Sequence, residues 1–293
     1  MVGKHCQLPS CRRHLATHIL QEMEPPLTEI ANEEGTDKGT EGPRPRRGHN
    51  YTDVYDAYLC GFRNQPITVL EIGLGVTGPA WNADYFANSN ASRGGASMRM
   101  WYRYFPAARI LGIDVNPASF LDNDRITTGV VDQSDPEQLR AFLQQAGVEG
   151  VDVIIDDGSH RPDHQQISLS ALFPCLVSGG LYFIEDLLDN GRDDGRTDRH
   201  SNDGVLNTRE VLLKFSRSGV FPGPNALSSP ETLASLVEQV SFYNPDMTTE
   251  QMSTWPLRKR MRTAAAILLK KPPDVAVEYS HPRKDSLCVL RRI

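Results

Sequence analysis

The chain has 293 residues and a net charge of −6, and 39% of its residues are hydrophobic. This length suits one large α/β domain, or one domain with appendages, and the hydrophobic content is enough for a sizeable core. The acidic balance argues against a nucleic-acid binder, because phosphate binding needs a basic face.

A membrane location is not expected either, because no run reaches the roughly 18 apolar residues of a membrane span. The first residues lack the apolar core of a signal peptide. The five cysteines are scattered, and Cys6 and Cys11 alone cannot form a zinc site, which needs four close ligands. We therefore expect reduced thiols in a cytoplasmic protein.

The first 47 residues are polar and contain many helix breakers, including Pro25 and Pro26. Within them only residues 12–23 look helical. We therefore treat residues 1–47 as an N-terminal extension and residues 48–293 as the main domain.

The main domain begins with a helix expected at residues 51–62, on an apolar stripe formed by Tyr51, Val54, Tyr55, Tyr58 and Leu59. Strand-like runs separated by helical stretches follow at residues 67–72, 108–113, 126–131, 151–155 and 180–184. Strands that alternate with helices indicate a doubly wound, parallel sheet of the α/β class. Residues 239–243 and 286–291 predict an antiparallel strand pair that closes the sheet, with a helical insertion between them.

A long polar stretch at residues 187–207 interrupts this order and is nearly free of apolar residues. Such a loop inside a compact domain is usually a lid, a binding loop or a disordered segment. Because the stretch follows Asp186 directly, we favour a mobile lid; simple disorder is the alternative.

Two of the predicted strands end in pairs of acids, Asp156 and Asp157 in one case and Glu185 and Asp186 in the other. In open α/β sheets, ligands bind beyond the carboxyl ends of the strands. Carboxylates crowded at one edge repel each other unless a cation lies among them, and oxygen ligands favour Mg²⁺ or Ca²⁺. The pattern predicts a metal site.

A histidine, His160, follows the first acid pair and is a candidate general base. The plainer alternative is a residue at a helix start that bonds to the backbone. His164, one helical turn later, is a second candidate base or an orienting partner.

Glycines follow the first strand, where Gly73, Gly75 and Gly78 match the pattern GxGxxG. Two observations argue against a dinucleotide. Glu71 would repel a pyrophosphate, and roughly thirty residues separate the loop from the next strand. An acid beside a glycine loop suits a cationic nucleoside ligand, S-adenosylmethionine (SAM).

Polar residues after the next two strands fit the same ligand. Asp114 can bind the ribose hydroxyls, and Asp132 and Gln133 can reach an adenine edge. Each of these acids, taken alone, has the alternative of an ordinary polar residue at a strand end. The ordered series is more specific than any single member.

Together these motifs resemble class I SAM-dependent methyltransferases, and more closely the metal-dependent O-methyltransferases of macrolide sugar tailoring. The resemblance covers residues 35–186, roughly half of the chain. It includes Gly35-Thr-Asp-Lys-Gly39, His49-Asn-Tyr51-Thr, Gly94-Gly-Ala-Ser-Met-Arg-Met-Trp101, Ile155-Asp-Asp-Gly-Ser-His160 and Phe183-Ile-Glu-Asp186.

The resemblance implies a Rossmann-like fold, Mg²⁺ as a metal cofactor and a role for each site residue. It assigns Mg²⁺ binding to Asp157, Glu185 and Asp186, and proton removal to His160. Asp156 is then structural or faces the cofactor. The segment around Thr36, Lys38, His49 and Tyr51 is implied to fold over the cofactor pocket.

The activity that follows is methyl transfer from SAM to a hydroxyl of a small natural product, an acceptor of sugar or polyketide type, in secondary metabolism. A homo-oligomer is compatible with the family, and no nucleic-acid or membrane partner is expected. The family's aromatic continuation after Asp186 is absent and residues 245–285 are unfamiliar, so the resemblance alone does not decide whether the acceptor is a sugar. The alternatives are a SAM-binding enzyme that catalyses a non-methylating step and a non-catalytic SAM-binding scaffold.

Overall fold

The computed structural model describes residues 24–41, 48–78, 93–187, 204–243 and 287–293. The helices expected at residues 12–23 and within 245–285 lie outside the described residues, as does most of the loop 187–207. No described helix is long and apolar enough to cross a membrane.

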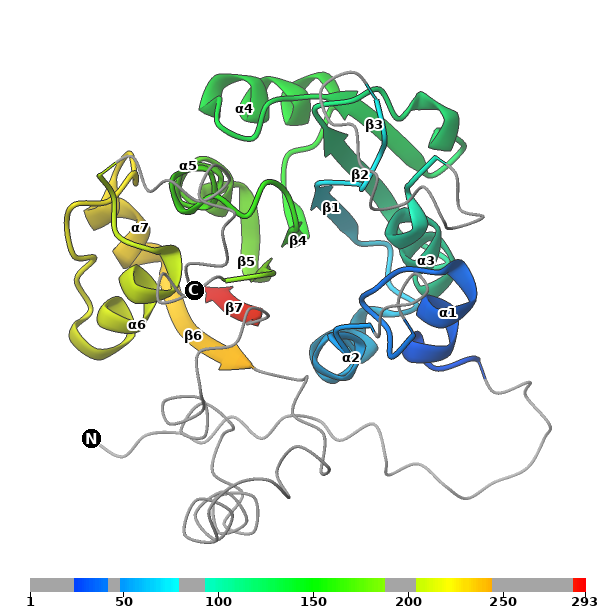
Figure 1. Ribbon diagram of the computed structural model, residues 1–293, viewed down its shortest axis with the longest axis horizontal. Helices are drawn as coiled ribbons and strands as arrows, with labels where there is room; N and C mark the ends of the chain where they lie inside the picture. The colour runs from blue at the N-terminus through cyan, green and yellow to red at the C-terminus, as the bar shows by residue number, and fades with distance from the viewer. Residues whose placement is uncertain (1–23, 42–47, 79–92, 188–203, 244–286) are drawn as a thin grey trace, which may run out of the picture.

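The described residues form a seven-stranded sheet in the order β3-β2-β1-β4-β5-β7-β6 (Figure 1). The strands are β1 Thr68–Ile72, β2 Arg109–Asp114, β3 Ile126–Val130, β4 Val151–Asp156, β5 Leu176–Ile184, β6 Val237–Tyr243 and β7 Leu287–Arg292. The first five strands are parallel, and β7 runs antiparallel to both β5 and β6. The predicted fold, a mostly parallel sheet closed by an antiparallel pair, is confirmed.

Helices cover both faces of the sheet (Figure 1). They are α1 Leu27–Glu34, α2 Thr52–Leu59, α3 Ala96–Tyr104, α4 Pro136–Gln145, α5 Pro162–Leu172, α6 Thr208–Ser218 and α7 Pro230–Leu236, with short 3-10 turns η1 Cys60–Phe62, η2 Ser119–Leu121 and η3 Phe173–Cys175. Side chains of successive strand residues point to opposite faces. In β4, Val153 and Ile155 pack in the core beneath α1, α2 and α3, whereas Ile154 packs in the core beneath α4, α5 and α6.

Helix α1 corrects the prediction that only residues 12–23 of the first 47 look helical. Pro26 occupies the N-cap with φ −57°, and Gly35 ends the helix in the left-handed conformation with φ 77°. Leu27, Ile30 and Ala31 are buried on one side. The breakers therefore mark the ends of a short amphipathic helix, because proline suits the start and glycine the end of a helix.

The expectation of reduced thiols is wrong for Cys60, which is disulfide-bonded. Cys175 is a free thiol. Cysteine spacing in the sequence does not reveal which thiols the fold brings together, so this pairing could not be predicted.

The carboxyl ends of β1, β4 and β5 lie at one edge of the sheet. Ile72 pairs with Asp156, and Asp156 pairs with Ile184. Gly73, directly after β1, has φ +83°, and an added Cβ would lie 2.1 Å from the Asp157 carbonyl oxygen. The glycine turn and the first acid pair are therefore in backbone contact.

Gly73→Ala is expected to lower the free energy of unfolding by roughly 3 kcal/mol, from left-handed backbone strain together with the clash against the turn after β4. Gly219→Ala is the matched control. Gly219 has φ +71° but nothing within 4 Å of an added Cβ, so only the strain of roughly 1 kcal/mol remains. Denaturant unfolding measures both variants. Equal losses would contradict the close contact.

Candidate active site

The strand-end acids and His160 converge at the carboxyl edge of the sheet. His160 Nε2 lies 4.0 Å from Asp157 Oδ1 and 3.7 Å from Asp186 Oδ2. One potential ligand atom from each of these three residues lies within 4.8 Å of the other two. Two carboxylates and an imidazole at this separation can hold a divalent cation.

Two members of this group have an unusual backbone conformation. His160 has φ 60° and Asp186 has φ 50°. Non-glycine residues in the left-handed region store strain, which is found most often at functional sites. The backbone therefore turns both side chains toward the common edge at an energetic cost.

Glu185 is placed differently from its neighbour Asp186. It is buried, with 2% of its surface exposed. Its Oε1 accepts a hydrogen bond from Lys38 Nζ at 2.8 Å and another from the Tyr55 hydroxyl. Burial, together with the charge of Asp157, raises the pKa of Glu185 well above its ordinary value.

Lys38 is the buried cation of this cluster. Its Nζ lies 2.5 Å from Asp157 Oδ2, 2.8 Å from Glu185 Oε1 and 3.4 Å from Glu71 Oε1. Burial lowers the pKa of Lys38, but the surrounding carboxylates outweigh this effect and hold the pKa well above its ordinary value. The lysine therefore stays charged and links the acid after β4 to the acid in β1.

The segment before α2 supplies the other contacts to the acids. The Tyr51 hydroxyl donates to Asp186 Oδ1 at 2.7 Å, and its ring stacks on His49 at 5.2 Å. His49 Nε2 lies 3.6 Å from an oxygen of Asp37. Thr36 is buried, and its hydroxyl oxygen accepts from the Lys38 backbone N–H at 3.4 Å.

Sequence reasoning missed Tyr55 as a site residue, because Tyr55 belongs to the apolar stripe of its helix. It is fully buried and stacks edge-on against Trp101 at 5.1 Å, as a core residue would. The available signal was its spacing of four residues from Tyr51, which places both phenols on one helix face.

Glu71 lies in β1 with no exposed surface, and neither carboxylate oxygen has a hydrogen bond of normal geometry among the described residues. Burial raises its pKa from 4.5 to about 7 despite the nearby Lys38 ammonium. A buried carboxylate with free acceptor capacity suits a cationic ligand group.

Glu71→Gln is expected to remove a pH-dependent loss of stability. Below pH 4.5 the acid is protonated in both the unfolded and the folded chain, and its stabilising contribution is complete. As pH rises through the folded pKa of about 7, the ligand-free wild type loses that contribution, roughly 3 kcal/mol in total. Unfolding between pH 4 and pH 8 should show the variant gaining on the wild type by this amount. Parallel curves would contradict the shift.

Asp114 fixes the glycine turn against the end of β2. Its Oδ2 accepts from the Leu74 N–H at 2.9 Å and its Oδ1 accepts from the Asn116 N–H at 2.8 Å. Gly75, in the same turn, has φ 61°. Asp132 is exposed after β3, where its Oδ1 accepts from the backbone N–H and the hydroxyl of Ser134.

The contacts of Asp156 are those of a structural residue, which is the first of the two roles expected for it. It has no exposed surface and accepts hydrogen bonds from Gln133 Nε2 at 2.6 Å and from the Tyr182 hydroxyl at 3.2 Å. Burial raises its pKa to about 6. Gln133 also accepts from the Ser159 N–H at 2.9 Å, so this pair anchors the turn that carries Asp157 and His160.

The other candidate base, His164, lies in the first turn of α5. Its Nδ1 is 2.9 Å from the Ser159 hydroxyl, and its Nε2 is 3.8 Å from an oxygen of Asp163. It is not part of the group formed by Asp157, His160 and Asp186.

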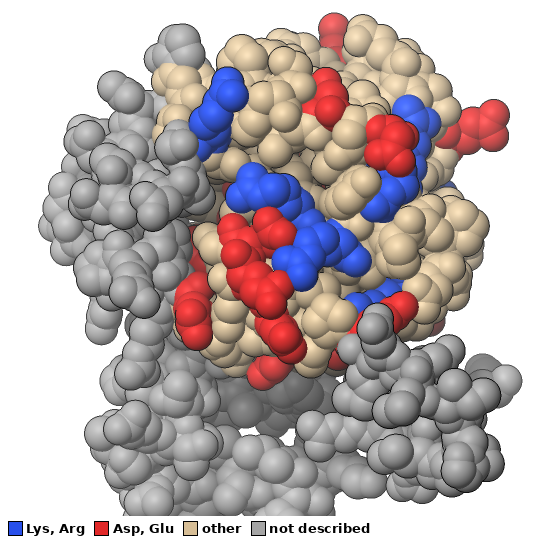
Figure 2. All heavy atoms as spheres, turned by 90° about the vertical axis from the view of Figure 1, so that its right-hand side faces the viewer, with Lys and Arg blue, Asp and Glu red and all other residues tan. Residues whose placement is uncertain are grey.

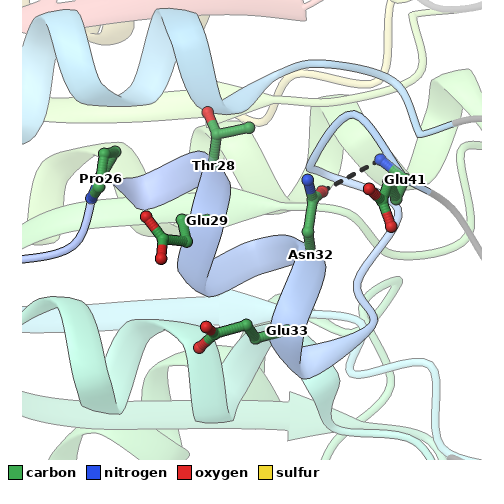
Figure 3. A pocket seen from close by; sticks show the side chains of 6 residues that line it. All are labelled: Pro26, Thr28, Glu29, Asn32, Glu33 and Glu41. Carbon is green, nitrogen blue, oxygen red and sulfur yellow. Dashed lines mark hydrogen bonds between the residues drawn. The ribbon is translucent and has the colours of Figure 1, made fainter.

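A separate hollow of about 530 Å³ lies along α1 and is lined by Pro26, Thr28, Glu29, Asn32, Glu33 and Glu41 (Figure 3). No predicted site residue lines it. On the adjoining face, acidic and basic side chains lie next to each other (Figure 2). Arg103 pairs with Glu33 at 2.6 Å, and Arg99 pairs with Glu34 at 2.9 Å.

Comparisons with known proteins agree with the motifs. No family model matches the chain. A demethylmacrocin O-methyltransferase of Streptomyces fradiae is 41% identical over 140 residues, which is 47% of this chain and 32% of the relative. An L-olivosyl-oleandolide 3-O-methyltransferase of Streptomyces antibioticus is 34% identical over 180 residues, 59% of this chain and 40% of the relative.

Among solved structures, a methyltransferase from the mycinamycin biosynthetic pathway, in complex with Mg and SAH, has a TM-score of 0.55 and 31% identity. The match covers 75% of this chain and 52% of that one. The chain thus spans about half of the solved relative and less than half of these curated relatives. The described residues have a class I methyltransferase fold, and in sequence and fold the chain resembles the O-methyltransferases of macrolide sugar tailoring.

Proposed function

We propose that this chain carries out SAM-dependent, Mg²⁺-assisted O-methylation of a hydroxyl on a natural product in secondary metabolism. The observation that carries the proposal is the group of Asp157, His160 and Asp186 at the strand ends. This group touches the glycine turn, because Gly73 approaches the Asp157 backbone within contact distance. A metal-and-base site and a methyl-donor site would then share one edge.

The residues present fit SAM at the ends of β1 and β2. The buried Glu71 carboxylate has free acceptor capacity for a cationic group. Gly73 lets the end of β1 approach the Asp157 backbone, and Gly75 has φ 61°, a conformation that glycine adopts without strain in a tight ligand-binding turn. We assign Asp114 to the ribose and Asp132 to the adenine edge, with Thr36, Lys38, His49, Tyr51 and Gln133 supporting the pocket. Asp156 supports it indirectly through Gln133.

The residues also fit a hard divalent cation, because carboxylates dominate the donor set. We assign Asp157, Glu185 and Asp186 as ligands of Mg²⁺, which supplies Lewis acidity that lowers the pKa of an acceptor hydroxyl. His160 removes the hydroxyl proton, and the chain aligns the resulting oxygen with the sulfonium methyl group of SAM. General-base assistance is worth ~10²–10⁴-fold in rate.

The relatives' names support a choice of acceptor class, because they specify glycosylated natural products such as rhamnosyl tetracenomycin and olivosyl-oleandolide. We propose a sugar hydroxyl on such a small molecule as the acceptor. The non-methylating enzyme and the scaffold that the sequence left open gain no support from these comparisons.

The test is transfer of a labelled methyl group from SAM to a panel of glycosylated polyketides, using the whole chain with Mg²⁺ or with EDTA. Label should enter the acceptor with Mg²⁺ and fall to background with EDTA. Transfer that EDTA leaves unchanged would remove the metal from the mechanism. Consumption of the acceptor without label would favour the non-methylating alternative, and SAM binding without turnover would favour the scaffold.

A further inference from the structure

Lys38 contacts two of the three acids assigned to Mg²⁺. Its ammonium lies against Asp157 Oδ2 and Glu185 Oε1, while the third acid, Asp186, is held by Tyr51. Lys38 has 1% of its surface exposed. A full positive charge is thus built into the carboxylate cluster, in contact with the oxygens that a divalent cation would use.

Glu185 shows most clearly that the Lys38 ammonium contacts an oxygen that a divalent cation would use. The described acids and histidines close enough to share an ion are Asp157, His160 and Asp186, and Glu185 is not among them. Its Oε1 instead faces the Lys38 ammonium and the Tyr55 hydroxyl. Glu185 can ligate a cation only after leaving these donors, because two cations on one carboxylate oxygen repel each other strongly in a buried site.

We propose that Lys38 is a positioning residue that competes with the divalent cation for Asp157 and Glu185, and so sets the metal affinity of the site. This inference rests on the proposed function. When the metal binds, Lys38 gives up Glu185 and keeps Glu71, its partner in β1 at 3.4 Å. After this exchange Glu185 is paired with the metal ion and Lys38 with Glu71, so each of these charged groups keeps a partner of opposite charge.

The loop that carries Lys38 connects this exchange to α2. The Lys38 carbonyl oxygen accepts from the Thr52 N–H at 3.1 Å, at the first residue of the helix. Gly48 packs against Gly39 so closely that an added Cβ would lie 2.0 Å from the Gly39 carbonyl oxygen. The lysine is therefore held by a tightly packed loop, so that its charge opposes metal binding from a fixed position.

The test is the affinity of the whole chain for Mn²⁺, measured by calorimetry for the wild type and for Lys38→Met. Removing the competing charge should tighten Mn²⁺ binding at least about tenfold at pH 8. Without metal, the variant should melt on the order of 10 °C lower, because three carboxylates, two of them buried, lose their cation. Saturating Mn²⁺ should narrow that gap. Lys214→Met, at an exposed pair with Glu210, is the matched control and should change neither value.

Tyr55→Phe provides a second variant that keeps the charge of Lys38. It removes the other donor on Glu185 Oε1 and should tighten Mn²⁺ binding about threefold; it carries the test if Lys38→Met does not fold. Binding by these variants that equals or falls below that of the wild type overturns the inference. If wild type and variants all fail to bind Mn²⁺, the metal part of the proposed function fails as well.

Discussion

Asp157→Asn is expected to reduce methyl transfer at least about a thousandfold while SAM affinity stays within about threefold of the wild type. Asp157 serves both halves of the carboxylate cluster, since Oδ1 faces His160 and Oδ2 contacts Lys38. Asparagine keeps the shape of the side chain but removes the charge that attracts a cation. Labelled-methyl transfer measures the rate, and calorimetry measures SAM and Mn²⁺ binding separately.

The control for this substitution is Asp152→Asn in the same strand. Asp152 lies toward the opposite end of β4, where its Oδ2 accepts from the Thr68 N–H at 2.8 Å. It should leave turnover and Mn²⁺ affinity unchanged. Normal turnover by Asp157→Asn in the presence of EDTA would show that the reaction needs neither this acid nor the metal.

The sheet could be predicted from sequence because each strand is indicated by the residues of the strand itself. Each central strand is a short buried run that is bounded by a glycine or a polar residue, and such runs can be recognised without knowledge of their partners. Helix α1 was missed because Pro25 and Pro26 suggested irregular chain. Its apolar side, formed by Leu27, Ile30 and Ala31, is too short to stand out among polar residues.

The edge of the site was predictable for the same reason, since parallel strands deliver their carboxyl ends to one place. The internal arrangement of the acids was not. Lys38 meets Glu185 across 147 residues of sequence, and Tyr55 meets it across 130. No local sequence pattern around Lys38 or Tyr55 indicates that its side chain contacts Glu185. Asp156 is the last residue of β4, whereas Asp157 follows the strand. The sequence does not place the strand end to within one residue, so the different roles of these two acids could not be predicted.

His160→Asn is expected to lower kcat by ~10²–10⁴-fold while SAM affinity and Mn²⁺ affinity remain close to those of the wild type. Asparagine suits this position, because His160 has φ 60° and asparagine tolerates the left-handed backbone better than alanine does. The variant therefore removes the imidazole with little added strain. His164→Gln is the control and should keep most of the activity; a reversal of the two results would make His164 the base.

The Mn²⁺ measurement decides between two roles that the geometry allows for His160. Its Nε2 lies within 4.8 Å of potential ligand atoms on both Asp157 and Asp186, so the imidazole could bind the cation instead of accepting a proton. A ligand role predicts that His160→Asn loses Mn²⁺ affinity and kcat together. A base role predicts that only kcat falls, because the carboxylates still hold the metal. If Glu185 becomes a ligand once Lys38 yields it, three carboxylates suffice for the cation and His160 is left free to take the proton.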